Sequence, residues 1–486
     1  MKYDVIIIGS GAGGAAAAYH LTQTGKQVLV VEKGMPLPRD GSTLDVGAVM
    51  RRGAFLSTER WVDRRGELIV PEEHFNVGGK TKWYGAALLR FAPHEFDADS
   101  ERQFLSWPIR YDELAPFYDE AEQLLGVRTF APEPALQRLV GALHGFDQRW
   151  SKQTLMVGLD RNILDYPEEA GHFDGFASVR GLKSDAETCL LDRVRDKRNL
   201  HIVTGNGVRA LLPSVSGPLR VAGVECEDGT RYHADAVLLA AGALHSPRLL
   251  QSYLDRSGLE AELPAARSVG RNYKFHVLTA LLAFSHRPMN DVLSKTLLLT
   301  HEAFPHSTVQ TLGGSLTRDI VLTQAPAFVP QALIRPFASR AIGLFLQTED
   351  GSHRDNRVLV GGGWPPRPQI DHDARRIPAA TQEHRQLVRL LRSQLVQVGY
   401  LPVTKAIPLT GTAHACGTLA AGNDPMQSVV NAEGRVHGME NLYVVDGSVL
   451  PRSSRVNPAL TIYAWALRVA SRMEIARTRV AEAAVH

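Results

Sequence analysis

The residues best suited to carry chemistry lie near the C-terminal end of the chain. His414 stands in the segment His-Ala-Cys-Gly-Thr, and Asn457 stands in Arg-Val-Asn-Pro-Ala-Leu-Thr-Ile. A neutral histidine accepts a proton near physiological pH, and an asparagine amide can hold an oxygen atom by a hydrogen bond. The pair therefore predicts removal of a hydroxyl proton, provided that a nearby group accepts the hydride from the adjoining carbon.

The N-terminus predicts a site for such an acceptor. A short apolar run at residues 4–8 is typical of a buried parallel strand, and Gly9, Gly11 and Gly14 follow it in the pattern G-x-G-x-x-G. Gly9 allows a tight turn, and Gly11 lets the backbone approach a pyrophosphate. Gly14 lets the next helix pack against the strand, and the N-terminus of that helix offers free N–H groups to a phosphate.

A second strand and an acid complete this dinucleotide-binding pattern. The apolar run at residues 28–31 ends in Glu32, which is placed to accept hydrogen bonds from ribose hydroxyls. An acid at this point also disfavours a cofactor with a 2′-phosphate. The motif therefore predicts FAD or NAD and leaves the choice between them open.

Length and composition restrict the class of protein. The chain has 486 residues, of which 44% are hydrophobic and 22% charged, so it is long enough for two domains. Its net charge of +3 comes without a polybasic run, which disfavours a nucleic-acid partner. The three cysteines lie far apart, and we predict neither a disulfide framework nor a metal site.

Hydropathy along the chain sets an expectation for location. No apolar stretch is long enough to span a membrane. The first strand begins at residue 3 or 4, which leaves no room for a signal peptide. We therefore expect a cytoplasmic enzyme.

Two domains are interleaved along the sequence. From about residue 281 to 410 turn residues and short strands alternate, and the glycine-rich character of the nucleotide domain returns after 410. The predicted nucleotide-binding domain comprises residues 1–150, 185–280 and 411–486, and the predicted substrate-binding domain comprises residues 151–184 and 281–410.

Several motifs resemble, in order, those of the glucose–methanol–choline (GMC) family of FAD-dependent oxidoreductases. The block from His414 to Ser471 is the closest match. The resemblance implies an α/β fold, with an FAD-binding, doubly wound (Rossmann-like) domain and an inserted α+β substrate domain built on an antiparallel sheet. The other matching segments are the N-terminal glycine motif with Glu32, Asn76 to Arg90, Trp107 to Val127, Val237 to Leu250, Val269 to His276 and Asn356 to Val358.

The resemblance also assigns roles to residues. It implies that His414 is the catalytic base, that Asn457 holds the second active-site position, and that N5 of FAD accepts the hydride. Some members bind the flavin covalently through a histidine, but this chain has Lys80 to Tyr84 in that region, so we expect non-covalent FAD. The cofactor-binding residues that we predict are Gly9, Gly11, Gly14, Glu32, Gly78, Gly79, Val208, Gly242, Asp446, Gly447 and Pro458.

Some residues admit more than one interpretation. An asparagine before a proline is typical of a helix N-cap, so Asn457 and Pro458 are also expected to begin a helix aimed at the flavin. Trp83 and Tyr84 are predicted to line the cavity beside the flavin. Tyr84 replaces an asparagine common in the family, and Ala420-Ala421 replaces Arg-Met, so the substrate and the electron acceptor stay open.

We consider three functions for a chain with these motifs. The first is oxidation of an alcohol, sugar or glycoside, with electrons passing to oxygen, a quinone or another acceptor. The second is an NAD(P)-linked flavoprotein reductase, which would need a second nucleotide fingerprint that we do not find. The third is a lyase that retains FAD structurally. His276, His437 and Cys416 are interpreted as structural.

Overall fold

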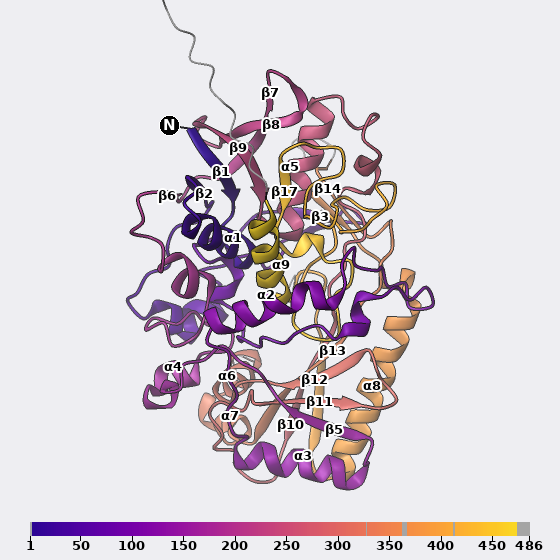
Figure 1. The fold of residues 1–486 in the computed structure, drawn as a ribbon. Coiled ribbons are helices and arrows are strands. Elements are labelled where there is room, and N and C mark those ends of the chain that lie inside the picture. The colour runs from indigo at the N-terminus through magenta and orange to yellow at the C-terminus, as the bar shows by residue number, and fades with distance from the viewer. Residues whose placement is uncertain (1, 327, 362–366, 412–413, 474–486) are drawn as a thin grey trace, which may run out of the picture.

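Two large β-sheets lie at opposite ends of the molecule, with helices between and around them (Figure 1). The structure is a computed structural model that describes residues 2–326, 328–361, 367–411 and 414–473. The last part of the predicted nucleotide domain, residues 474–486, lies outside the described residues.

The first sheet has seven strands and contains the N-terminal strand. Its parallel strands are apolar and buried, as expected for a sheet covered by helices on both faces. Besides β1, strand β9 pairs with two further strands: β8 pairs with its first part and β17 with its last part. The strands lie in the order β6 (Leu200–Val203), β2 (Val28–Val31), β1 (Lys2–Ile8), β9 (Arg231–Leu239), β8 (Gly217–Cys226) and β7 (Val208–Ser214), with β17 (Leu442–Val444) beside β9.

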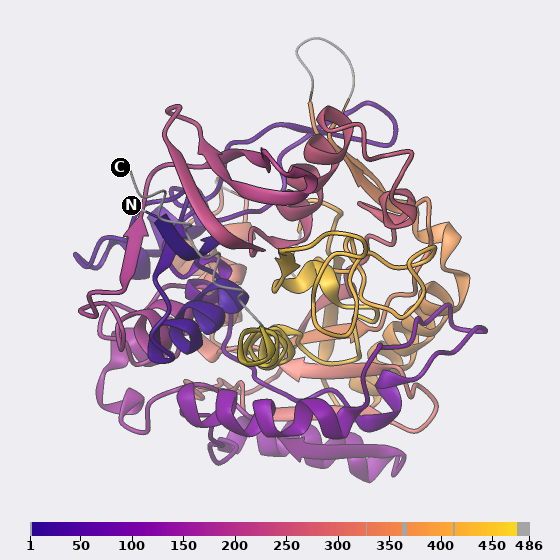
Figure 2. The same cartoon turned by 45° about the horizontal axis from the view of Figure 1, so that its top comes forward.

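The helix after the glycine motif packs tightly against the C-terminal part of the chain. Helix α1 (Ala12–Gln23) is rich in alanine and glycine, which lets other backbones approach it closely. Helix α9 (Ala459–Arg472) contacts both α1 and α2 (Tyr111–Leu124), and Figure 2 shows α9 end-on between them. The first and the last helix that the structure describes therefore belong to one packed unit.

The second sheet has six antiparallel strands. Residues that alternate along a strand point to opposite faces, so each strand contributes to two environments. One face forms an apolar cluster with α3 (Pro134–Phe146) and α8 (Pro378–Gln397). The strand order is β16 (Leu401–Ala406), β10 (Val277–Phe284), β13 (Ala341–Thr348), β12 (Ser307–Thr311), β11 (Leu297–His301) and β5 (Trp150–Thr154).

The opposite face of this sheet carries buried polar side chains. Thr308 and Gln347 both donate hydrogen bonds to the carbonyl of Arg455, and Gln310 donates to Asn457. The loop before α9 is thereby held against the second sheet, and residues of both units meet there.

Smaller elements complete the fold. A four-stranded sheet consists of β14 (Arg357–Leu359), β15 (Gln369–Asp371), β3 (Trp61–Asp63) and β4 (Leu68–Ile69). The remaining helices are α4 (Pro167–Gly171), α5 (Gly242–Arg256), α6 (Gly314–Gln324) and α7 (Gln331–Ala338), with the short helices η1 (Ser42–Leu44), η2 (Gly47–Arg51), η3 (Gly79–Lys82), η4 (Pro93–Phe96), η5 (Ile163–Asp165), η6 (Glu187–Leu191), η7 (Pro264–Ser268), η8 (Ala374–Arg376) and η9 (Gly447–Val449).

The predicted fold class is confirmed: a parallel, helix-covered sheet is joined to an α+β unit built on an antiparallel sheet. The division into residue ranges stays a prediction. Helix α3 precedes the predicted boundary at residue 150 and packs on the antiparallel sheet. In the part of the chain that the structure describes, no helix is both long and apolar enough to cross a bilayer.

Candidate active site

The backbone of the glycine motif forms a cradle at the N-terminus of α1. Gly9 has φ +103°, and a Cβ there would lie 2.5 Å from the carbonyl oxygen of Ala240. Apart from Gly11 itself and its chain neighbours, no described residue has an atom within 4 Å of the position that a Cβ of Gly11 would take. Among the described residues, no side chain caps α1 and its first turn has no acid. Open space beside free helix N–H groups fits the pyrophosphate of a dinucleotide.

A second glycine segment closes over this cradle. The N–H of Gly78 donates to Oγ of Ser10 at 3.1 Å, and a Cβ of Gly79 would lie 3.2 Å from Cα of Gly11. Both glycines have positive φ, of +84° and +55°, which favours glycine over other residues. We call the backbone of Gly9, Ser10, Gly11, Gly78 and Gly79 the nucleotide cradle.

Glu32 lies at the end of β2 and is held by its neighbours. Its Oε2 accepts hydrogen bonds from the N–H and the hydroxyl of Ser10 at 2.9 and 2.6 Å, and its Oε1 accepts from the N–H of Gly34 at 2.8 Å. Burial raises the pKa of this carboxyl. Because each oxygen can accept two hydrogen bonds, Oε1 retains capacity for a ribose hydroxyl.

Asp446 joins three elements at the corner of the cradle. Its Oδ2 accepts from the N–H of Gly242 and the hydroxyl of Ser246, and its Oδ1 accepts from the N–H and hydroxyl of Ser448. The carboxylate thereby fixes the starts of α5 and η9. Contacts of Asp446, Gly242 and Gly447 with FAD stay predictions.

The predicted cofactor-binding residues Val208 and Pro458 lie at the starts of two different elements, β7 and α9. Val208 begins β7, two residues after Asn206, whose N–H donates to the carbonyl of Glu32 at 3.3 Å. Pro458 is the N-cap of α9 and adjoins Asn457. Their contacts with the cofactor likewise stay predictions.

The predicted catalytic pair is brought together. Nδ2 of Asn457 lies 3.2 Å from Nε2 of His414, although 43 positions separate the two residues. Nδ1 of His414 lies 2.9 Å from Nδ1 of His276. The other end of the Asn457 amide, Oδ1, accepts a hydrogen bond from Nε2 of Gln310. His414 has φ +66°, so its backbone adopts a conformation that is costly for a residue other than glycine.

The electrostatic surroundings keep both histidines neutral. Burial lowers the pKa of His414 well below its usual value of 6.5, and the positive charge of nearby groups, including Lys295, lowers it further. Burial lowers the pKa of His276 to about 4. A neutral His414 can accept a proton at physiological pH, which a charged one cannot.

The interpretation of Asn457 as a helix cap is wrong. Helix α9 begins at Ala459 with Pro458 as its N-cap, so Asn457 stands one residue too early. The physical reason is that both ends of the Asn457 amide are engaged by other side chains, Gln310 and His414.

Trp83 and Tyr84 have structural hydrogen bonds. Nε1 of Trp83 donates to Oδ1 of Asn76 at 2.9 Å, and the indole stacks on His74 with ring centroids 4.7 Å apart. The hydroxyl of Tyr84 donates to the carbonyl of Ser184 at 2.6 Å. Their place beside the flavin stays a prediction.

Two residues of the site were not predicted from the sequence. His276 was interpreted as structural, yet it contacts the imidazole of His414. Gln310 lies in β12, whose five residues are all buried. A glutamine in a buried strand is a weak signal for a polar partner, and nothing in the sequence identifies Asn457 as that partner.

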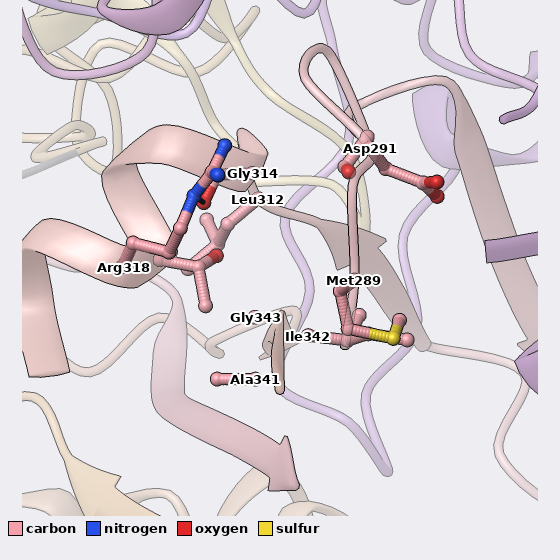
Figure 3. Close-up of a pocket in the computed structure, with 10 residues that line it drawn as sticks. Met289, Asp291, Leu312, Gly314, Arg318, Ala341, Ile342 and Gly343 are labelled. Carbon is pink, nitrogen blue, oxygen red and sulfur yellow. Dashed lines mark hydrogen bonds between the residues drawn. The ribbon is translucent and has the colours of Figure 1, made fainter. Parts of the chain in front are cut away.

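A separate small pocket lies at the N-terminus of α6 (Figure 3). The carboxylate of Asp291 accepts hydrogen bonds from the N–H groups of Ala135 and Leu136, and Arg318 donates to the carbonyl of Gly314. These charged groups are engaged within the protein, so the pocket offers no evident chemistry.

Comparisons with known proteins agree with this architecture. A family model described as FAD dependent oxidoreductase matches residues 4–269, and one described as GMC oxidoreductase matches residues 365–466. Paromamine 6'-oxidase from Streptomyces fradiae is 29% identical, over 96% of this chain and 90% of that protein. Cholesterol oxidase from Mycobacterium tuberculosis is 25% identical, over 96% of this chain and 90% of that protein.

Solved structures show the same fold. Pyridoxine 4-oxidase from Mesorbium loti has a TM-score of 0.68 at 21% identity, covering 96% of this chain and 98% of the other. A variant of formate oxidase from Aspergillus oryzae has a TM-score of 0.70 at 16% identity, covering 97% of both chains. The chain belongs to the FAD-dependent oxidoreductases, and among these to the GMC family. It is an oxidoreductase whose cofactor is FAD.

Proposed function

We propose that this enzyme oxidises a CH–OH group to a carbonyl, with His414 as the base. The observation that carries the proposal is the pair of nitrogen atoms 3.2 Å apart, one on His414 and one on Asn457. A hydroxyl both donates and accepts hydrogen bonds, so one oxygen can donate to Nε2 of His414 and accept from Nδ2 of Asn457.

Each residue then has a defined part in the reaction. Nε2 of His414 takes the hydroxyl proton, and the N–H of Asn457 stabilises the negative charge that develops on the substrate oxygen. The two contacts fix the oxygen and so orient the C–H bond. Bound FAD supplies the hydride acceptor, and non-covalent binding in the nucleotide cradle is part of the proposal.

The substrate class is an alcohol, a sugar or a glycoside. Relatives named for oxidising paromamine and cholesterol support hydroxyl-bearing substrates, although their substrates differ widely in polarity. The proposed electron acceptor is oxygen or a quinone, and the proposed location is the cytoplasm. Reoxidation of the reduced enzyme by oxygen or by a quinone, and fractionation of cells, test these two points.

The test of the base is His414→Ala. We expect turnover to fall about 10²- to 10⁴-fold, the usual contribution of a general base, while the protein keeps its yellow FAD. His437→Ala is the matched control, because that imidazole contacts Ser428 and the carbonyl of Gly422 instead. Full activity of the His414→Ala enzyme would contradict the proposal. Anaerobic addition of an alcohol separates the two functions: an oxidoreductase loses its yellow flavin colour, whereas a lyase keeps it.

A further inference from the structure

A row of hydrogen bonds runs through the catalytic pair and ends at a backbone carbonyl. It joins Gln310, Asn457, His414, His276 and the carbonyl oxygen of Ser454. We call these five groups the polar row. Both of its ends lie outside the pair that is proposed to contact substrate, and they come from different parts of the fold.

The carbonyl of Ser454 determines the direction of the first two hydrogen bonds. A carbonyl oxygen can only accept, so Nε2 of His276, 2.7 Å away, must carry a hydrogen. His276 is neutral, because burial lowers its pKa to about 4, and its Nδ1 is therefore an acceptor. It follows that Nδ1 of His414 donates across the 2.9 Å contact to His276.

The same reasoning continues to the other end of the row. His414 is neutral with its hydrogen on Nδ1, so its Nε2 holds a lone pair. The amide group that faces this lone pair must be the NH₂ of Asn457, which turns Oδ1 toward Gln310. Gln310 donates its own N–H to that oxygen. Every N–H in the polar row thus points toward the carbonyl of Ser454.

Both ends of the row are held rigidly. Gln310 lies in the interior of the six-stranded sheet, where β12 pairs with β11 at Leu298 and with β13 at Phe345. At the other end, the N–H of Ser454 donates to Glu349 and its hydroxyl donates to Glu95. A reversed row would place the lone pair of Nε2 of His276 against the carbonyl oxygen of Ser454, two acceptors in contact, so the carbonyl fixes the direction.

We propose that Gln310 and His276 are positioning residues for the hydroxyl-binding pair. Gln310 sets the orientation of the Asn457 amide, and His276 sets the tautomer of His414, so that one oxygen meets a donor and an acceptor. This inference rests on the proposed function of His414. It goes further because it assigns a role in the chemistry to a residue of the antiparallel sheet.

The direct test is the ring ¹⁵N NMR spectrum of the wild-type holoenzyme labelled at histidine. The His414 signal is assigned by its loss in His414→Ala, and we expect chemical shifts of the Nδ1–H tautomer at neutral pH. An Nε2–H tautomer would overturn the inference without requiring any variant of Gln310. The spectrum does not depend on turnover, so this failure is distinguishable from failure of the base assignment.

The second test replaces Gln310. A carboxylate in Gln310→Glu attracts the NH₂ of Asn457 and turns Oδ1 toward His414, where it favours the imidazolium. We expect anaerobic flavin reduction to slow about 100-fold, the usual effect of losing one donor to a developing oxyanion. The acid limb of its pH profile moves to higher pH, since the pKa of His414 rises.

Gln310→Leu and Gln347→Leu form a matched pair. Both residues lie on the same sheet face and contact the loop before α9, but Gln347 donates to the carbonyl of Arg455 and not to Asn457. We expect Gln310→Leu to slow flavin reduction about tenfold, and Gln347→Leu to retain the wild-type pH profile. Equal rates and profiles in the two folded variants would overturn the role of Gln310.

Discussion

The nucleotide cradle is built from the backbone of two short glycine segments, whereas each link of the polar row joins single residues that lie 43 to 178 positions apart. In the cradle, glycine provides space and N–H groups, and the hydroxyl of Ser10 joins the N–H of Gly78 to Glu32. In the polar row, the identity and orientation of each side chain decide what the group can do. We therefore expect a changed cradle to lose the cofactor, and a changed row to retain the cofactor without the chemistry.

The largest expected effect comes from a glycine outside the G-x-G-x-x-G positions. A Cβ on Gly13 would lie 1.8 Å from the carbonyl oxygen of Val445, so Gly13→Ala must push α1 away from the corner at Asp446. We expect a loss of more than about 3 kcal/mol of stability, together with loss of FAD. Thermal unfolding and flavin absorbance of the purified protein measure both. Normal melting with a full complement of FAD would show that the contact is not tight.

Gly11→Ala should affect the cofactor alone. Gly11 has φ −67°, which alanine adopts readily, and its Cβ would enter the open space of the cradle. We expect the apoprotein to melt as wild type, while the Kd for FAD rises about 100-fold, equivalent to about 2.7 kcal/mol. Titration of the apoprotein with FAD measures this. Unchanged affinity would place the pyrophosphate away from Gly11.

Acid should destabilise the protein through its buried neutral histidines. Burial lowers the pKa of His384 to about 4, so the unfolded state, with pKa 6.5, binds more protons. Stability is therefore complete above pH 6.5 and falls as pH drops toward about 4. His384→Gln should remove about 2 kcal/mol of the loss between pH 6.5 and about pH 5. Urea unfolding at these two pH values tests it, and an unchanged pH slope would contradict the prediction.

The smallest expected effect concerns Tyr84. Tyr84→Phe removes the 2.6 Å hydrogen bond to the carbonyl of Ser184 and should cost about 1 kcal/mol of stability. If Tyr84 also lines the flavin cavity, KM for the substrate changes as well. A change in melting temperature without a change in KM would assign the residue to the structure alone.

The sequence predicted those parts of the molecule that depend on local pattern. The first strand, the glycine turn, the second strand and Glu32 follow one another within about thirty residues, and each constrains the next. The proximity of His414 and Asn457 was predicted from the order of family-like motifs rather than from their spacing. Gln310 could not be predicted, because it meets Asn457 only when the antiparallel sheet packs against the loop before α9. No local sequence pattern encodes this packing.

The wrong prediction of Asn457 as a helix cap shows the limit of a local pattern. Asn followed by Pro is typical of a helix start, but an amide has two ends and here both have partners outside the helix. Gly13 shows the reverse case. It occupies a variable position of the motif, yet among the glycines of this segment a Cβ there would come closest to another backbone, 1.8 Å from the carbonyl oxygen of Val445.

The contact of Gly13 with Val445, together with the pairing of β17 with β9, bears on the order in which the protein is made. A ribosome delivers the glycine motif first, but the segment that closes its corner emerges after residue 440. His414 and Asn457 also emerge late, after Gln310, the residue that we propose orients Asn457. A chain interrupted at residue 440 includes His414 but lacks Val445, Asp446 and Asn457, so it can form neither the corner beside the glycine motif nor the proposed hydroxyl-binding pair.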